Sequence, residues 1–207
     1  MLVKLHSTIV IVFCFSQLKW TTGFGLGPCP KIENTRTINT TKLTGHWFEI
    51  ERSFYLMELI STCVTLDLNE NARGRFDVSV NTRSAWTGIF SISEGIAIPT
   101  KVDPTLYLYK VNSRLPRLIN RYLPGTGFYK VLKTDYNNYL VVYSCTNYQI
   151  IHLDMIWIWG RKNEIDAELR SDLYALLNKY DIDTERLILS KSNNCTDEYY
   201  DDLDYYY

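Results

Sequence analysis

The chain has 207 residues, of which 46% are hydrophobic and 22% charged, and its formal net charge is −1. This length allows a single domain with a sizeable core. A net charge this close to zero gives no reason to expect binding to nucleic acid or a general electrostatic attraction to membranes. The charge is uneven, because the last eleven residues hold five acids and no base.

Residues 1–25 are predicted to be a secretory signal peptide. Lys4 provides the positive charge, a short apolar run follows it, and the small residues Thr21, Gly23 and Gly25 suit cleavage. The apolar run is too short to span a bilayer. We therefore expect a secreted, extracellular protein.

The rest of the chain divides into a main domain and a tail. We expect the domain to cover residues 26–195. The tail, residues 196–207, is acidic and rich in tyrosine, and this composition predicts disorder. Its tyrosines stand beside acids, so sulfation is a further hypothesis.

Short alternating segments separated by polar turns fill most of the domain and are typical of an all-β sandwich or barrel. One amphipathic helix follows them, with Asn163 as its expected N-cap and an apolar stripe from Ile165 to Tyr180. A last short strand is predicted at Arg186–Ser190. The other strands are predicted at Cys63–Leu68, Arg75–Arg83, Gly88–Ile92, Gly95–Ile98, Thr105–Val111, Gly127–Lys133, Tyr139–Tyr143 and Gln149–Trp159.

Three motifs organise this pattern. Gly45 and Trp47 open an alternating strand, Thr134-Asp135-Tyr136 lies in a turn between two strands, and Arg161 ends the run after Trp157. In this order and at these separations they resemble the conserved motifs of the lipocalins. The segment Leu26-Gly27-Pro28-Cys29-Pro30 and the cysteine positions resemble the branch of apolipoprotein D and insect Lazarillo.

The resemblance implies an eight-stranded antiparallel up-and-down barrel with one C-terminal α-helix packed on its outside. It also implies a carrier for a small hydrophobic ligand such as a lipid, fatty acid, retinoid or bilin, with roles in lipid transport and stress protection. Gly45, Trp47, Thr134, Asp135, Tyr136 and Arg161 would then be structural, with Arg161 stacked on Trp47 to seal the closed end.

Four cysteines remain outside the signal segment. An even number in a secreted chain predicts two disulfides, and four cysteines allow three pairings. The resemblance selects Cys29–Cys145 and Cys63–Cys195.

Alternation gives the expected cavity wall, because every second residue of a barrel strand points inward. Arg83 could meet a carboxylate ligand inside the barrel, or it could lie at the open rim in water. The expected ligand-binding residues are Leu66, Leu68, Asn81, Arg83, Tyr107, Tyr109, Val111, Trp157 and Trp159.

The sequence offers little for catalysis. His46 and His152 are expected to be structural, and disulfides would use the cysteines, so we expect no catalytic residues, no metal site and no cofactor. A lipocalin-type isomerase would need a nucleophile in the cavity. Asn39, in Asn39-Thr40-Thr41, is an expected glycosylation site.

The segment 114–124 is basic and apolar and is expected near the open end. It could be an ordinary solvated loop, or it could contact anionic lipid surfaces during ligand uptake. An alternative function follows from the same segment: an extracellular interaction protein that binds a receptor through this loop and the acidic tail. The oligomeric state stays open.

Overall fold

The computed structural model describes residues 24–32, 38–53, 61–116, 125–191 and 195. The acidic tail and nearly all of the expected signal peptide lie outside the described residues. Most of the 114–124 loop does as well.

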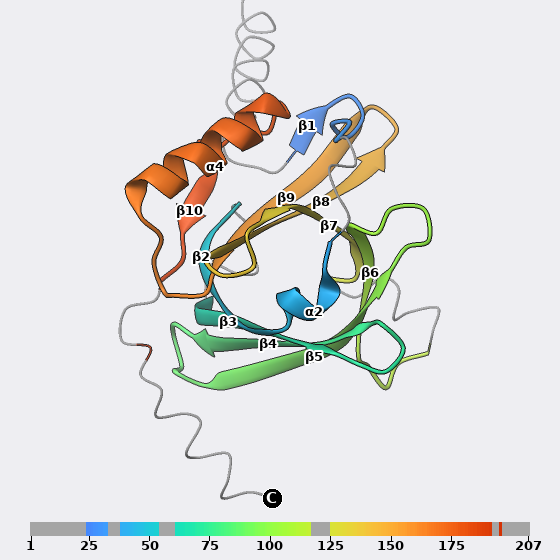
Figure 1. The fold of residues 1–207 in the computed structure, drawn as a ribbon, viewed down its shortest axis with the longest axis vertical. Coiled ribbons are helices and arrows are strands. Elements are labelled where there is room, and N and C mark those ends of the chain that lie inside the picture. Colours follow the sequence, from blue (N-terminus) through green and yellow to red (C-terminus); the bar gives the residue numbers. More distant parts are fainter. Residues whose placement is uncertain (1–23, 33–37, 54–60, 117–124, 192–194, 196–207) are drawn as a thin grey trace, which may run out of the picture.

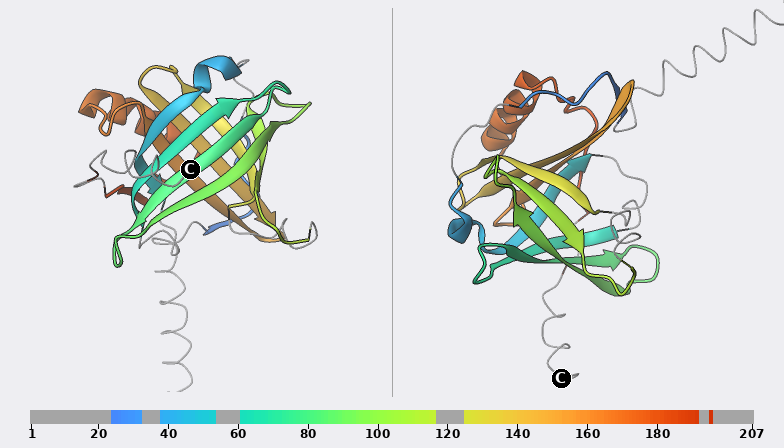
Figure 2. Two further views of the ribbon diagram at one scale, coloured as in Figure 1. Left: turned by 90° about the horizontal axis from the view of Figure 1, so that it is seen from below. Right: turned by 90° about the vertical axis from the view of Figure 1, so that its right-hand side faces the viewer.

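Eight antiparallel strands form a closed barrel, as predicted. Each strand pairs with the next along the chain, and β9 pairs back with β2 to close the ring (Figure 1). The strands are steeply tilted to the barrel axis (Figure 2), as closure of a sheet requires. Their bounds are β2 Gly45–Ser53, β3 Ser61–Glu70, β4 Phe76–Ser84, β5 Phe90–Pro99, β6 Leu106–Val111, β7 Gly127–Thr134, β8 Tyr139–Tyr148 and β9 Ile151–Gly160.

Two short strands extend the barrel sheet. β1, Phe24–Leu26, pairs with the start of β9. β10, Leu187–Leu189, pairs with the end of β2, where β2 no longer pairs with β3. The last strand therefore fills a gap in the wall, and it confirms the strand predicted there. β1 was not predicted, and it begins inside the expected signal peptide.

Helix α4, Ala167–Lys179, covers the outside of the barrel over β8 and β9 (Figure 1). Its Leu173 and Leu177 are fully buried against Val141 and Ile158. The predicted N-cap was wrong. Asp166 caps the helix by accepting a hydrogen bond from the Leu169 amide.

Two buried carboxylates of the barrel, Glu51 and Asp154, hold α4 and the segment after it in place. Arg170 Nε lies 2.6 Å from a carboxylate oxygen of Glu51 on β2, and the Tyr174 hydroxyl donates to the same carboxylate. Arg186 binds Asp154 of β9 through two nitrogens, at 2.5 and 2.7 Å. Such forked pairs restrict orientation as well as distance.

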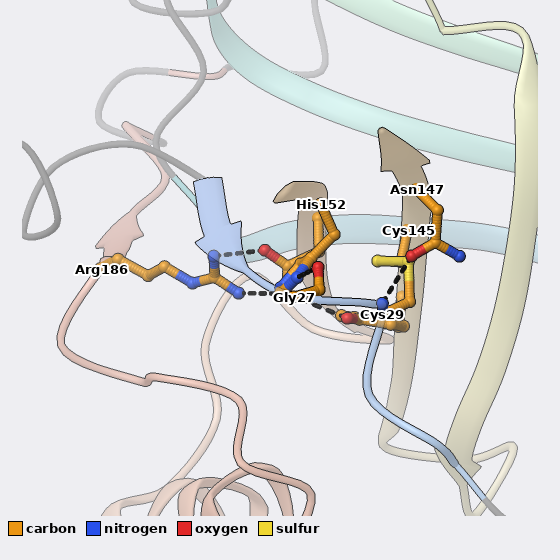
Figure 3. Close-up of a disulfide and its surroundings, with 8 residues drawn as sticks. Gly27, Cys29, Cys145, Asn147, His152 and Arg186 are labelled. Atoms are coloured by element: carbon orange, nitrogen blue, oxygen red, sulfur yellow. Dashed lines mark hydrogen bonds and ion pairs between the residues drawn. A yellow bond between two sulfur atoms is a disulfide. The ribbon is translucent and has the colours of Figure 1, made fainter. Parts of the chain in front are cut away.

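The disulfides are Cys29–Cys145 and Cys63–Cys195, the pairing implied by the resemblance. The first holds the N-terminal segment beside β8 and β9 (Figure 3). There, the Cys29 amide donates to Asn147 at 2.6 Å, and a ring nitrogen of His152 donates to the Gly27 carbonyl at 3.0 Å. His152 is thus structural.

Candidate ligand-binding site

Trp47 closes one end of the barrel. Its side chain is fully buried, and its indole N–H donates to the Leu43 carbonyl at 2.9 Å. Leu43 belongs to the short helix α2, Thr40–Leu43, which lies across this end of the barrel (Figure 1). Asn39 caps that helix and is exposed, so its glycosylation stays a prediction.

The Arg161 guanidinium lies 3.6 Å from the centre of the Trp47 ring. It also donates hydrogen bonds to four backbone carbonyls, those of His46, Thr44, Lys42 and Tyr136. The predicted seal is confirmed. It joins the start of β2, the residues before it and the β7–β8 turn.

Gly45 is required twice at this seal. Its φ of +102° is in the region that favours glycine. A Cβ there would also lie 3.1 Å from an Arg161 nitrogen. Both reasons explain why a glycine precedes the plug.

Asp135 holds the β7–β8 turn together. Its Oδ1 accepts from the amides of Asn137, Asn138 and Tyr139, and Oδ2 accepts from the Asn138 side chain at 2.6 Å. Burial alone would raise the pKa of Asp135, but these hydrogen bonds outweigh it and hold the pKa below the ordinary value. The role of this turn is structural.

Above the seal, the inner face of the barrel is apolar and becomes accessible toward the open end. Tyr107, Leu140 and Trp159 near the base are at most 6% exposed. Nearer the mouth on the same strands, Tyr109, Val142 and Met155 are partly exposed although they pack in the same cluster. The base is therefore filled, and the upper wall is open to solvent.

Aromatic side chains line part of this accessible wall. The rings of Tyr109 and Tyr129 are 5.9 Å apart edge to face, and those of Tyr129 and Trp157 are 5.5 Å apart. Burial raises the pKa of Tyr109 despite its hydrogen bond with Ser93. These rings present flat apolar surface with hydroxyls that are already engaged, since Tyr129 donates to the Gly125 carbonyl.

Strand β5 provides the space in front of them. Its inner face carries the small residues Ser93, Gly95 and Ala97, identified by their pairing with Val80, Val78 and Phe76 on β4. A Cβ on Gly95 would lie only 2.4 Å from the Tyr109 ring. The tyrosine therefore lies directly against the β5 backbone.

The prediction was wrong for two residues, Asn81 and Arg83, which lie on the outer face of the barrel and not in the cavity. Asn81 donates to Thr65 and Asp67 on the outside of the barrel. Arg83 has the same parity and stacks on the exposed ring of Phe90. A shift of one residue moves a whole strand face from inside to outside.

The remaining predicted wall residues lie on the inner face. Leu66, Leu68, Tyr107, Tyr109, Trp157 and Trp159 belong to one interior cluster, and Val111 shares their face through its pairing with Gly95. Tyr107 differs from Tyr109. Its hydroxyl is buried with no hydrogen-bond partner among the described residues, and burial followed by the charges of Glu70 and Tyr136 raises its pKa to about 12.

A buried pair of oppositely charged residues on β2 was not predicted from the sequence. Glu49 and Arg52 pair with each other, and Ser190 donates to Glu49 at 2.9 Å. Their strand partners are Trp159 and Trp157, so both side chains belong to the inner face. Burial raises the pKa of Glu49, and Arg52 and Ser190 act in the opposite direction. The sequence did carry a signal for Glu49, because it is two residues from the inward-facing Trp47 and so points to the same side of the strand.

Two hollows outside the closed end are polar. One of 440 Å³ is lined by Lys42, Asp135 and Arg161 among others, and one of 690 Å³ lies at the start of α4. Neither offers the apolar surface that a hydrophobic ligand needs. Within the described residues, no group of three or more potential ligands is arranged to hold a metal, and no helix is long and apolar enough to cross a bilayer.

Comparison with known proteins agrees with this geometry. The model of the lipocalin / cytosolic fatty-acid binding protein family matches residues 119–192. Apolipoprotein D of Cavia porcellus is 31% identical over 84% of this chain and 87% of its own length. The chain belongs to the lipocalin family. Apolipoprotein D of Bos taurus is 28% identical over 83% of this lipocalin and 86% of its own chain.

Solved lipocalin structures share the fold. Apocrustacyanin C2 superposes with a TM-score of 0.72 at 17% identity, covering 86% of this chain and 95% of its own. Insecticyanin of the tobacco hornworm Manduca sexta gives 0.66 at 18% identity, covering 83% and 89%. By sequence, the crustacyanin-A1 subunit of Homarus gammarus is 24% identical over 78% of this lipocalin and 86% of its own chain. The family is one of carriers of small hydrophobic ligands.

Proposed function

We propose that this lipocalin is a secreted, non-enzymatic carrier that holds a small hydrophobic ligand, of the lipid class, in its barrel. The observation that carries the proposal is the change along the inner wall. The base is sealed by Trp47 and Arg161, whereas Tyr109, Val142 and Met155 above it are accessible. Two disulfides and the predicted signal peptide support an extracellular location.

The inner wall favours a ligand whose buried part is uncharged. Arg83, the expected partner for a carboxylate, is on the outer face. Glu49 and Arg52 neutralise each other within the wall. Burial of about ten methylenes at ~0.8 kcal/mol each would give ~8 kcal/mol before ordering costs. Apolar burial alone is therefore enough for useful affinity, and a carboxylate would stay at the mouth.

A pair of matched variants on β5 tests this proposal. Ala97→Phe places a phenyl ring on the inner face, whereas Ile96→Phe places the same ring on the outer face one residue away. We expect Ala97→Phe to weaken retinol binding, followed by quenching of tryptophan fluorescence, by about tenfold or more. Ile96→Phe should bind like the wild type. Equal binding by all three folded proteins would contradict the barrel site.

A natural ligand should also copurify with the protein. Native mass spectrometry of the protein purified from a eukaryotic host, followed by organic extraction, would detect it. Absence of any bound small molecule, together with no retinol or fatty-acid binding, would favour the alternative of an interaction protein that acts through the basic loop and the acidic tail.

Uptake from a lipid surface is a second proposal, and exposed apolar residues at the open end favour it. Trp86 is 82% exposed and Ile89 63% on the β4–β5 hairpin, Leu115 is 47% exposed after β6, and Ile150 is 79% exposed on the β8–β9 turn. Exposed apolar side chains on three loops of the same end favour an interaction there.

Co-sedimentation with phosphatidylcholine and phosphatidylserine vesicles tests this contact. Trp86→Ser combined with Ile89→Ser should reduce binding. The matched control is Val102→Ser, because Val102 is 91% exposed on the β5–β6 loop at the closed end. If both variants bind as the wild type does, the rim is not the contact.

A further inference from the structure

The polarity of β5 is the reverse of that of an ordinary barrel strand. Its inner face carries the small residues Ser93, Gly95 and Ala97. Its outer face carries Phe90, Ile92, Ile96 and Ile98, of which Ile92 is 46% exposed. These large apolar side chains face the solvent, so they do not contribute to the packing of the barrel interior.

The same outer surface continues onto β6 and β7. Ile98 pairs with Leu108, which pairs with Phe128, so the three side chains form one row across the strands. Phe128 is 52% exposed. We call Ile92, Ile96, Ile98, Leu108 and Phe128 the outer apolar face. Helix α4 lies across the barrel from it, over β8 and β9 (Figure 1).

Charges of both signs surround Ile96 on this face. Lys110 on β6 and Asp77 on β4 are its direct cross-strand partners, on opposite sides. Glu94 is two residues along β5, on the same face. All three charged side chains are exposed. A two-fold axis through Ile96 that lies in the interface, either along β5 or diagonal to it, therefore brings Lys110 of each copy against a carboxylate of the other.

We propose that the outer apolar face is a homodimer interface, in which two copies of this chain pack sheet against sheet around Ile96. Aligned and orthogonal sheet packing both place the two faces about 10 Å apart. The aligned arrangement pairs Lys110 with Asp77 of the second copy, and the orthogonal one pairs it with Glu94. A two-fold interface must be self-complementary, and a surface with an apolar centre and both charges beside it meets that condition.

The apolar part of the interface is tested by sedimentation equilibrium over a range of protein concentrations. The wild type should associate reversibly to a dimer. Phe128→Ser and Ile96→Ser should each weaken dimerisation by about tenfold or more, since central apolar anchors carry most of the binding energy. Val102→Ser, at the closed end, should dimerise like the wild type. A wild type that is monomeric at every concentration overturns the proposal.

A charge exchange tests the geometry. Lys110→Glu makes the surroundings of Ile96 wholly acidic, and Asp77→Lys/Glu94→Lys makes them wholly basic. Each variant alone should be monomeric. An equimolar mixture should form a heterodimer, because each acid then faces a base. Since Asp77 accepts a hydrogen bond from Asn71, thermal unfolding of each variant confirms that it is folded before the two are mixed.

Other results of these experiments would also overturn the homodimer interface. Dimerisation of the Phe128→Ser and Ile96→Ser variants at wild-type strength would place the interface elsewhere and overturn the proposal. Failure of the folded acidic and basic variants to associate on mixing would do the same. A monomeric wild type that binds vesicles through Ile92 would assign the face to lipid. Loss of retinol binding has no bearing on these results, so failure of the carrier function is distinguishable.

Discussion

At the scale of single residues, Arg161 has the largest number of partners at the closed end. It stacks on Trp47 and donates to four carbonyls from three segments. The planar fork of arginine can do both at once, and the ammonium of lysine cannot.

We expect Arg161→Ala to lower the free energy of unfolding by about 2–4 kcal/mol, because it removes the stacking and leaves carbonyls without donors. Arg161→Lys should lie between this variant and the wild type. Urea unfolding followed by fluorescence measures both. The neighbouring exposed Lys162 provides the control, and Lys162→Ala should change stability by less than about 0.5 kcal/mol. Equal stability of the two alanine variants would contradict the role of the seal.

Substitution of Tyr107 should not lower the stability, in contrast to substitution of Arg161. Its buried hydroxyl has no hydrogen-bond partner among the described residues, so Tyr107→Phe removes an unsatisfied polar group. We expect stability to be unchanged or raised by up to about 1 kcal/mol, and ligand binding to be unchanged. A marked loss of stability in a denaturant titration would indicate a partner for this hydroxyl.

Asp135 gives a pH dependence whose direction is defined. Its pKa in the folded protein is below the ordinary value of 3.8. The stabilisation is therefore complete above that value and is lost as the pH falls through the lowered pKa. Asp135→Asn should be less stable than the wild type at pH 7, and the difference should shrink in acid. A difference that is constant with pH would exclude this carboxylate as the cause.

At the scale of elements, α4 stabilises the barrel without taking part in the cavity. Leu173 is fully buried between the helix and β8–β9. Leu173→Ala should lower the free energy of unfolding by about 2–5 kcal/mol, while the folded variant keeps its affinity for retinol. Ala175→Ser, on the exposed side of the helix, is the control. Reduced retinol affinity in folded Leu173→Ala would mean that the helix shapes the cavity.

Strand β1 bears on where the predicted signal peptide would end. Cleavage after residue 25 would remove Phe24 and Gly25, which pair with Leu153 and His152. Cleavage after Gly23 keeps the whole strand and leaves small residues before the cut. We therefore expect the secreted protein to begin with Phe24. Intact mass spectrometry of the secreted protein decides this, and a chain that begins with Leu26 would contradict it.

Element types were more predictable from sequence than strand faces. The apolar alternation Phe76, Val78, Val80 was the correct signal for the inner face of β4, but the prediction placed the opposite set, with Asn81 and Arg83, in the cavity. β5 was split into two predicted segments because its large residues are outside and its small ones inside. Alternation alone does not say which side of a strand is the core.

At the scale of the whole molecule, the closure of the barrel and the register between strands come from long-range pairing. The sequence motifs predicted the seal, since Trp47 and Arg161 are recognisable individually. The inward position of Arg52 was not predicted, because a bulge in β2 between Glu49 and Glu51 changes which residues point inward after Glu49. Only the folded ring shows which polar residues share the wall with the tryptophans.

The seal of Arg161 also has a consequence for protein engineering. All four of its hydrogen-bond acceptors are main-chain oxygens, so the side chains of Lys42, Thr44 and His46 are not needed to hold it. The base of this lipocalin could thus be recoded at those positions to carry a fluorophore or an affinity handle. The opposite, open end of the barrel would not be changed by these substitutions.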